Sequence, residues 1–169
     1  MKIIFLDIDG VLNSQLWYLR IRNGETSCHD DVGLHNRNID TTAVKFLNTL
    51  IDETGAKVVI TSTWRLGRTI GELQSILESA GFVGEVIGKT EDLRYGSGGE
   101  SILRGNEILH WIKSNEALLD CYYNDFKSYV IIDDDSDMLY WQRNNFVQTD
   151  GYVGMTPTTI FKSKKILNT

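Results

Sequence analysis

Residues 5–12 read FLDIDGVL, an apolar run that ends in two aspartates and a glycine before turning apolar again. Residues 2–8 are rich in isoleucine, phenylalanine and leucine, which favours a buried strand. Asp7 and Asp9 lie two positions apart, so their side chains face the same way in an extended chain. Two carboxylates so close repel each other unless a cation lies between them. The stretch therefore predicts a strand that ends in a cation site, with a plain acidic turn as the alternative.

Short apolar runs alternate with longer segments of helical period along the rest of the chain. Further strands are expected at 57–61, 84–88, 129–132 and 145–148, and helices at 41–54, 70–80, 101–113 and 157–166. Continuous apolar strands that alternate with helices are typical of a parallel sheet covered on both faces. We therefore expect an α/β fold of three layers, a Rossmann-like parallel sheet, in a single domain over residues 1–169.

Polar residues follow three of the expected strands at the point where each one ends. The stretches are residues 7–10 (DIDG), 61–65 (TSTWR) and 133–137 (DDDSD). Ligands bind beyond the carboxyl ends of parallel strands, so we expect these stretches to meet at one edge. The acids offer hard oxygen ligands, and no Cys/His pair has zinc spacing, which favours Mg²⁺. Alone, residues 133–137 are more typical of a solvated loop, but two acid clusters after apolar strands favour a shared metal site.

The composition excludes several classes of protein. With 41% hydrophobic residues, the 169-residue chain can bury the core of one ordinary domain. No apolar run approaches the roughly 18 residues that predict a membrane helix, and two cysteines are too few for a disulfide framework, so we expect a cytoplasmic protein. The net charge of −6 argues against a broad basic face for non-specific nucleic-acid binding but leaves room for a small basic patch.

Taken together, the motifs resemble those of the haloacid dehalogenase (HAD) superfamily of phosphohydrolases. FLDIDGVL (residues 5–12) is similar to the first motif of that family, VITS (59–62) to the second and VIIDD (130–134) to the fourth. The resemblance covers nearly the whole chain. It implies a magnesium-dependent phosphomonoester hydrolase that works through an aspartyl-phosphate.

The resemblance assigns a role to each acid. Asp7 is the nucleophile that becomes phosphorylated, and Asp9 is the general acid and base. The resemblance places Mg²⁺ on the Asp7 carboxylate, the backbone carbonyl of Asp9 and an acid of the fourth motif. That acid is either Asp133 or Asp134. Asp134 is favoured if the ligand is the second acid of the motif's pair. Asp133 is favoured if the ligand has a supporting acid four residues later, which would be Asp137.

Hydroxyl and basic side chains are expected to hold the phosphoryl group. By the same resemblance the hydroxyl comes from Thr61, with Ser62 as the alternative one position away. The third motif is a single basic residue, and Arg104 is the best placed because it begins the helix before the fourth strand. Lys89 and Arg94 remain alternatives for it.

Three further segments resemble a narrower branch, the phosphatase-type domains of bacterial and phage RNA-repair proteins. They are residues 61–65, 105–111 (GNEILHW) and 151–156 (GYVGMT). This branch implies a phosphorylated substrate such as a nucleotide or the end of a nucleic acid. Residues 13–38 are long enough for a flap but too short for a folded cap domain, so we expect an open site. Arg65 is expected either to bind substrate phosphate or to form a structural ion pair.

Several other functions remain open at this point. A phosphoprotein or a small metabolite is the alternative substrate within the phosphatase class. An alternative of another class is a non-catalytic module that binds phosphate or nucleic acid on the same fold. Carbon–halogen hydrolysis needs neither a metal nor the second acid, so Asp9 and the 133–137 cluster argue against it.

Overall fold

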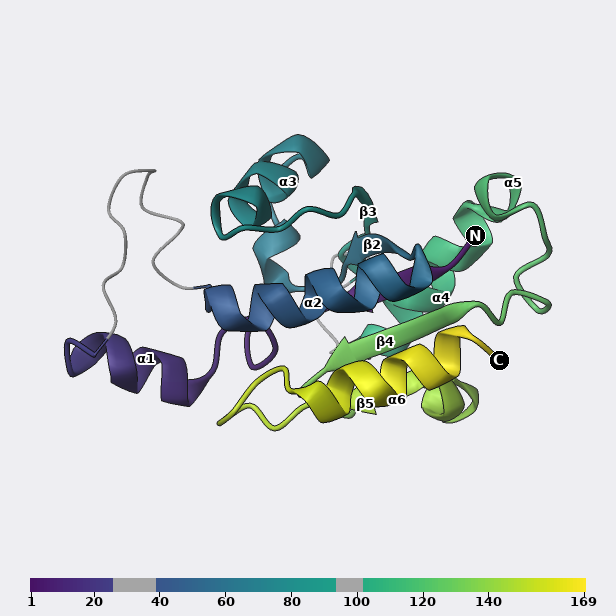
Figure 1. Ribbon diagram of the computed structural model, residues 1–169. Coiled ribbons are helices and arrows are strands. Elements are labelled where there is room, and N and C mark those ends of the chain that lie inside the picture. The colour runs from purple at the N-terminus through teal and green to yellow at the C-terminus, as the bar shows by residue number, and fades with distance from the viewer. Residues whose placement is uncertain (26–38, 94–101) are drawn as a thin grey trace.

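The computed structural model describes residues 1–25, 39–93 and 102–169 of the chain. Its strands form one sheet in the order β3-β2-β1-β4-β5, and every pairing is parallel (Figure 1). The strands are β1 (Ile3–Leu6), β2 (Lys57–Ile60), β3 (Val86–Lys89), β4 (Tyr129–Asp133) and β5 (Phe146–Gln148). The expected α/β fold with a parallel sheet is confirmed, and each strand lies within three residues of its predicted bounds.

Helices cover both faces of this sheet. They are α1 (Gln15–Arg22), α2 (Thr41–Thr54), α3 (Ile70–Ser79), α4 (Arg104–Ser114), α5 (Glu116–Leu119) and α6 (Pro157–Leu167), with 3-10 turns η2 (Thr63–Arg65) and η4 (Tyr140–Asn145). One core packs α2, α3 and α6 against alternate residues of the central strands, such as Ile4 and Leu6. A second core packs α4 and α5 against the other set, such as Ile3 and Phe5. The period of two along each strand therefore creates the three layers.

The helix ends follow local signals in the sequence. The Asp40 carboxylate accepts a hydrogen bond from the Thr42 N–H at 2.7 Å at the start of α2, and Gly55 ends that helix in the left-handed conformation. Helix α4 begins differently, because its N-cap Leu103 has no capping side chain. The Arg104 N–H instead donates to the Asp137 carboxylate at 2.8 Å, in the loop after β4. The acidic loop thus fixes the start of the helix that carries Arg104.

The segment expected to form a flap begins with a helix, α1, whose N-cap Ser14 accepts a hydrogen bond from Trp17. This helix was not predicted, because none of its residues is fully buried and its apolar positions give no clear stripe. The rest of the expected flap, the Gly-rich stretch at 96–99 and Arg94 lie outside the described residues. Among the helices of the described ranges, none has the length and apolar character needed to span a bilayer.

Candidate active site at the carboxyl edge of the sheet

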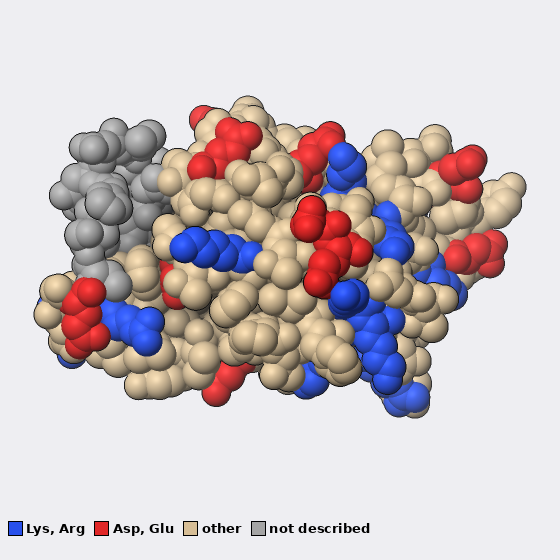
Figure 2. Space-filling model, in the orientation of Figure 1, with Lys and Arg blue, Asp and Glu red and all other residues tan. Residues whose placement is uncertain are grey.

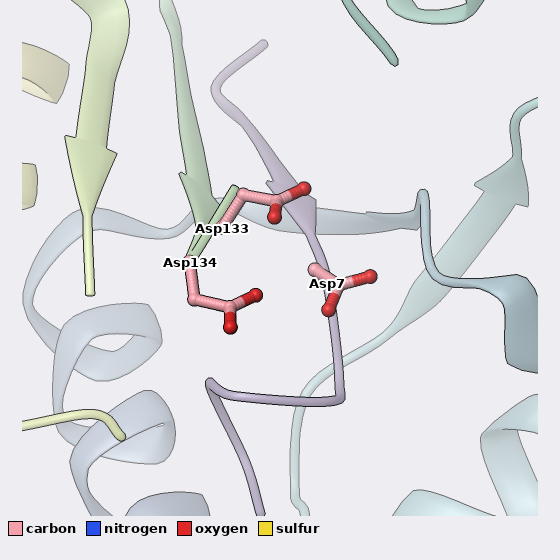
Figure 3. A group of neighbouring side chains, drawn as sticks. All are labelled: Asp7, Asp133 and Asp134. Carbon is pink, nitrogen blue, oxygen red and sulfur yellow. The ribbon is translucent and has the colours of Figure 1, made fainter. Parts of the chain in front are cut away.

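The acids of the first and fourth motifs meet beyond the ends of two neighbouring strands. β1 pairs with β4 in a register that sets Leu6 beside Ile132, and the Asp7 N–H donates to the Ile132 carbonyl at 3.0 Å. Figure 3 shows the carboxyl groups of Asp7, Asp133 and Asp134 gathered in one space at these strand ends. One oxygen from each lies within 4.8 Å of the others. Both candidates for the acid of the fourth motif therefore lie beside Asp7.

The cluster has the chemistry of a site for a hard divalent cation. Asp7 and Asp133 are 5% and 2% exposed, and Asp133 Oδ2 has no hydrogen-bond partner among the described residues. Burial, with the nearby Asp133 charge, raises the pKa of Asp7 to about 8, and burial raises the pKa of Asp133 to about 7. Without a cation, the folded protein therefore disfavours full ionisation of these acids. Mg²⁺ takes such oxygen ligands and would offset their repulsion.

Two glycines leave room for the Asp134 carboxyl group. Gly10 has φ +75°, and a Cβ atom placed there would lie 2.2 Å from Asp134 Oδ2. A Cβ atom at Gly151 would lie 2.6 Å from the same oxygen. Both distances are far shorter than a van der Waals contact, so the side chain of Asp134 keeps its place only because both positions lack a side chain.

Gly10→Ala is expected to weaken Mg²⁺ binding by about 10- to 100-fold, the usual effect of disturbing the surroundings of metal ligands. The new methyl group pushes Asp134 aside, and the positive φ adds about 1–2 kcal/mol of backbone strain. Isothermal titration with MgCl₂ measures the affinity. Gly55→Ala is the matched control, since Gly55 has φ +67° but a Cβ atom added there would have nothing within 4 Å. Equal Mg²⁺ affinities in the two variants would contradict the role given to Gly10.

Asp9 lies at the rim of the site rather than within the carboxylate cluster. Its side chain is exposed, and its two oxygens accept hydrogen bonds from Asn13 Nδ2 at 2.8 Å and Trp64 Nε1 at 2.9 Å. The Gly10 N–H donates to Asn13 Oδ1 at 3.1 Å, which ties the same turn together. These two partners orient Asp9. The sequence reasoning missed Asn13, although its place four residues after Asp9 is a usable signal.

Two candidates for the basic residue of the third motif, Arg104 and Lys89, lie in the described residues. Of these, Arg104 lies near the carboxylates. Its Nη2 atom lies 4.0 Å from Asp7 Oδ1, and its Nε atom lies 3.9 Å from Asp133 Oδ2. Lys89 instead donates to the backbone carbonyls of Arg65 and Arg68, behind the second motif. Of the alternatives for the third motif that the structure describes, the geometry therefore favours Arg104.

The two hydroxyl candidates of the second motif differ in their partners. Thr61 and Ser62 are both fully buried. The Ser62 hydroxyl accepts a hydrogen bond from the Trp64 N–H at 3.4 Å and caps η2, whereas the Thr61 hydroxyl has no partner among the described residues. The Thr61 carbonyl accepts from the guanidinium groups of Arg65 and Arg104. Thr61 is thus the residue with a hydroxyl still available.

Arg65 is placed as a structural residue and not at the mouth of the site. It is 2% exposed, and it donates to the carbonyls of Thr61, Ser62 and Thr90. Its Nη2 atom forms a 2.7 Å ion pair with Glu107 Oε2. Of the two roles expected for Arg65, these contacts support the ion pair, and its guanidinium is not directed at the cavity of the site. Its partner Glu107 lies in the 105–111 segment that resembles the narrower branch, but the sequence did not pair it with Arg65.

An open cavity of about 370 Å³ gives access to the acids. It is lined by Asp7, Asp9, Arg104, Asp133 and Asp134, together with residues of the first loop and α1 such as Ser14 and Tyr18. Thr61 and Ser62 do not line it, whereas Thr63 does. Five of the expected site residues therefore share one solvent-accessible space, whereas the two hydroxyls of the second motif are buried outside its lining.

Comparison with known proteins agrees with this arrangement. The family model described as "HAD domain in Swiss Army Knife RNA repair proteins" matches residues 3–160. The searches of curated proteins and of solved structures gave no match. The matched range contains all the strands of the described residues and all three acids of the cluster. The chain therefore belongs to the family of HAD domains found in Swiss Army Knife RNA repair proteins.

Proposed function

We propose that this protein is a Mg²⁺-dependent phosphomonoesterase that uses Asp7 as its nucleophile. The observation that carries the proposal is the meeting of three carboxylates within 4.8 Å, with the Arg104 guanidinium 4.0 Å from Asp7. Acids that repel one another need a cation, and the adjoining guanidinium suits an incoming anion. A phosphate monoester is an anion that would bind at both.

The residues that would hold Mg²⁺ are Asp7, the fourth-motif acids Asp133 and Asp134, and the backbone carbonyl of Asp9. When bound, the cation supplies Lewis-acid stabilisation of the negative charge on the phosphoryl oxygens. Asp133 Oδ2, which has no hydrogen-bond partner among the described residues, and the three converging carboxylates support this ligand set.

Residues of this chain take part in each step in which a bond forms or breaks. A carboxylate oxygen of Asp7 attacks phosphorus, and the bond from phosphorus to the leaving oxygen breaks as Asp9 gives that oxygen a proton. Water then attacks the phosphorus of the aspartyl-phosphate, Asp9 takes a proton from it, and inorganic phosphate leaves Asp7. Arg104 is proposed to stabilise the charge on the remaining oxygens, and the family resemblance gives the same role to Thr61, although its hydroxyl does not line the cavity in this structure.

The preferred substrate is a nucleotide or the terminal phosphate of a polynucleotide. The family description names RNA repair proteins, which favours a nucleic-acid substrate. The cavity of about 370 Å³ supports this choice, because its volume exceeds that of a phosphate group alone.

A panel of phosphomonoesters tests the proposal. It contains 3′- and 5′-phosphorylated oligonucleotides, mononucleotides, sugar phosphates and phosphopeptides, each assayed for phosphate release with MgCl₂ or with EDTA. We expect release that requires Mg²⁺ and favours the nucleic-acid substrates. Faster hydrolysis of sugar phosphates or phosphopeptides would contradict the substrate class. Mg²⁺ binding without release from any member would instead favour a non-catalytic binding module.

A further inference from the structure

A cavity lies at the amino ends of strands β4 and β5, opposite the carboxyl ends where the acids meet. It has a volume of about 770 Å³ and runs between α6 and the beginning of β5. Lys127, Lys162 and Lys165 line it, and no Asp or Glu side chain is among its described lining residues. Phe146 and Ile166 give it an apolar floor. We call this cavity the lysine groove.

Lys127 Nζ donates a hydrogen bond to the Asn124 carbonyl at 2.7 Å, and the other two lysines of the groove are available to an anionic partner. All three are exposed, and the Nζ atoms of Lys162 and Lys165 have no hydrogen bond or ion pair with any described residue. Lys164, on the same helix but outside the groove, is by contrast paired with Glu53 at 3.0 Å. Figure 2 shows basic side chains gathered where α6 runs in Figure 1. In a chain of net charge −6, three lysines around one hollow without an acid form a local positive patch.

The lysine groove leads toward the candidate active site. A second hollow of about 180 Å³ shares Val147 and Lys162 with it and continues along α6 to Asp150 and Gly154. Between these two residues lies Gly151, which lines the catalytic cavity. The second hollow has one acid, Asp150, whose Oδ1 accepts a hydrogen bond from the Tyr152 N–H at 2.8 Å. The two hollows thus run from the lysines to the loop at residues 150–154, and Gly151 of that loop lines the catalytic cavity.

We propose that the lysine groove binds the phosphate backbone of a single-stranded polynucleotide whose end is processed at Asp7. The proposal rests on the proposed function and deepens it, because it selects a polynucleotide over a mononucleotide. Helix α6 has 11 residues and is about 16 Å long, the length of about five stacked nucleotides. Lysines would contact phosphates, and Phe146 would offer its ring to a base or a ribose.

Binding measured without catalysis tests this groove separately from the proposed function. The probe is a fluorescein-labelled single-stranded RNA of about 12 nucleotides, titrated with full-length protein in EDTA and followed by fluorescence anisotropy. Lys162→Ala/Lys165→Ala is expected to weaken binding roughly tenfold at low salt and to reduce the slope of log Kd against log salt by about 1.4. Both positions are exposed on a helix, where alanine is well tolerated.

The matched control is Lys45→Ala/Lys164→Ala, which removes two positive charges outside the groove. It is expected to bind the RNA as the unmodified protein does. Equal Kd values and salt slopes for the two double variants would overturn the proposal, as would tighter, lysine-dependent binding of a polyglutamate peptide of the same charge.

A second readout is phosphate release. The Lys162→Ala/Lys165→Ala variant should lose the preference for oligonucleotides over mononucleotides and keep its rate of phosphate release from mononucleotides. Lysine-dependent RNA binding without any phosphate release would support the groove and contradict the proposed function.

Discussion

Asp7→Asn is expected to reduce phosphate release by three orders of magnitude or more and, at the same time, to stabilise the Mg²⁺-free protein. The loss of activity follows because an amide cannot form the aspartyl-phosphate. Steady-state hydrolysis of the preferred substrate of the panel measures it. Asp52→Asn is the control, since Asp52 is an exposed acid on α2 and its substitution is isosteric in the same way. Activity within tenfold of the unmodified protein would contradict a nucleophilic Asp7.

The gain in stability has a different cause, the burial of a carboxyl group beside Asp133. A raised pKa in the folded state means that the folded protein holds the Asp7 proton more tightly than the unfolded chain does. Its contribution to stability is therefore complete below the ordinary pKa of 3.8 and is lost as the pH rises through about 8. The amide carries no charge and avoids that loss. We expect Asp7→Asn to raise the free energy of unfolding by on the order of 1–3 kcal/mol near pH 8 and to have little effect near pH 4.

Thermal unfolding in EDTA over this pH range measures the effect. Adding MgCl₂ should stabilise the unmodified protein more than the variant, because the variant has lost a ligand. A variant that is less stable than the unmodified protein at every pH would show that Asp7 contributes favourable contacts that outweigh its burial. This pair of opposite effects, on activity and on stability, is characteristic of a residue retained for chemistry.

The sequence predicts the acidic cluster well because two simple rules determine it. Apolar runs of strand length locate β1 and β4, and parallel strands bring their carboxyl ends to one edge, so Asp7 and the 133–134 pair must approach each other. The choice between Thr61 and Ser62 did not follow from such rules. It depends on which hydroxyl caps η2, a detail of one local turn.

Contacts between charged residues far apart in the sequence were the least predictable part. Arg65 was expected either to bind substrate phosphate or to form a structural ion pair, and only the position of Glu107 decides between these roles. Glu107 lies on the face of α4 that packs toward the sheet, yet in the sequence it is one acid among apolar residues of an amphipathic helix. Helix periodicity gives the face of a residue but not the residue opposite it, 42 positions away in this pair.

Glu107→Gln is expected to destabilise the protein by about 3–5 kcal/mol, the usual cost of removing one partner from a buried ion pair. Glu107 is 3% exposed, and its Oε2 atom lies 2.7 Å from Arg65 Nη2 and 3.2 Å from Arg104 Nη1. A neutral amide leaves two guanidinium groups without their shared counter-charge. The midpoint of thermal unfolding should fall by roughly 10 °C. A fall of only a degree or two would mean that water or other groups compensate the two cations.

The same substitution should lower activity, because Glu107 positions the guanidinium that faces Asp7. Arg104 is held from two sides, by Glu107 and by the Thr61 carbonyl, and its remaining nitrogens lie near Asp7 and Asp133.

If Glu107 acts through Arg104, substituting Glu107 costs little activity in a variant that already lacks Arg104. We therefore expect Arg104→Ala and Arg104→Ala/Glu107→Gln to have similar kcat values when assayed below both unfolding transitions, while Glu107→Gln alone is clearly impaired. If the fold losses in kcat of the two single variants instead multiplied in the double variant, Glu107 would only support the fold. The dependence of one residue on the other separates a positioning role from a structural one, because loss of stability alone lowers activity equally whether or not Arg104 is present.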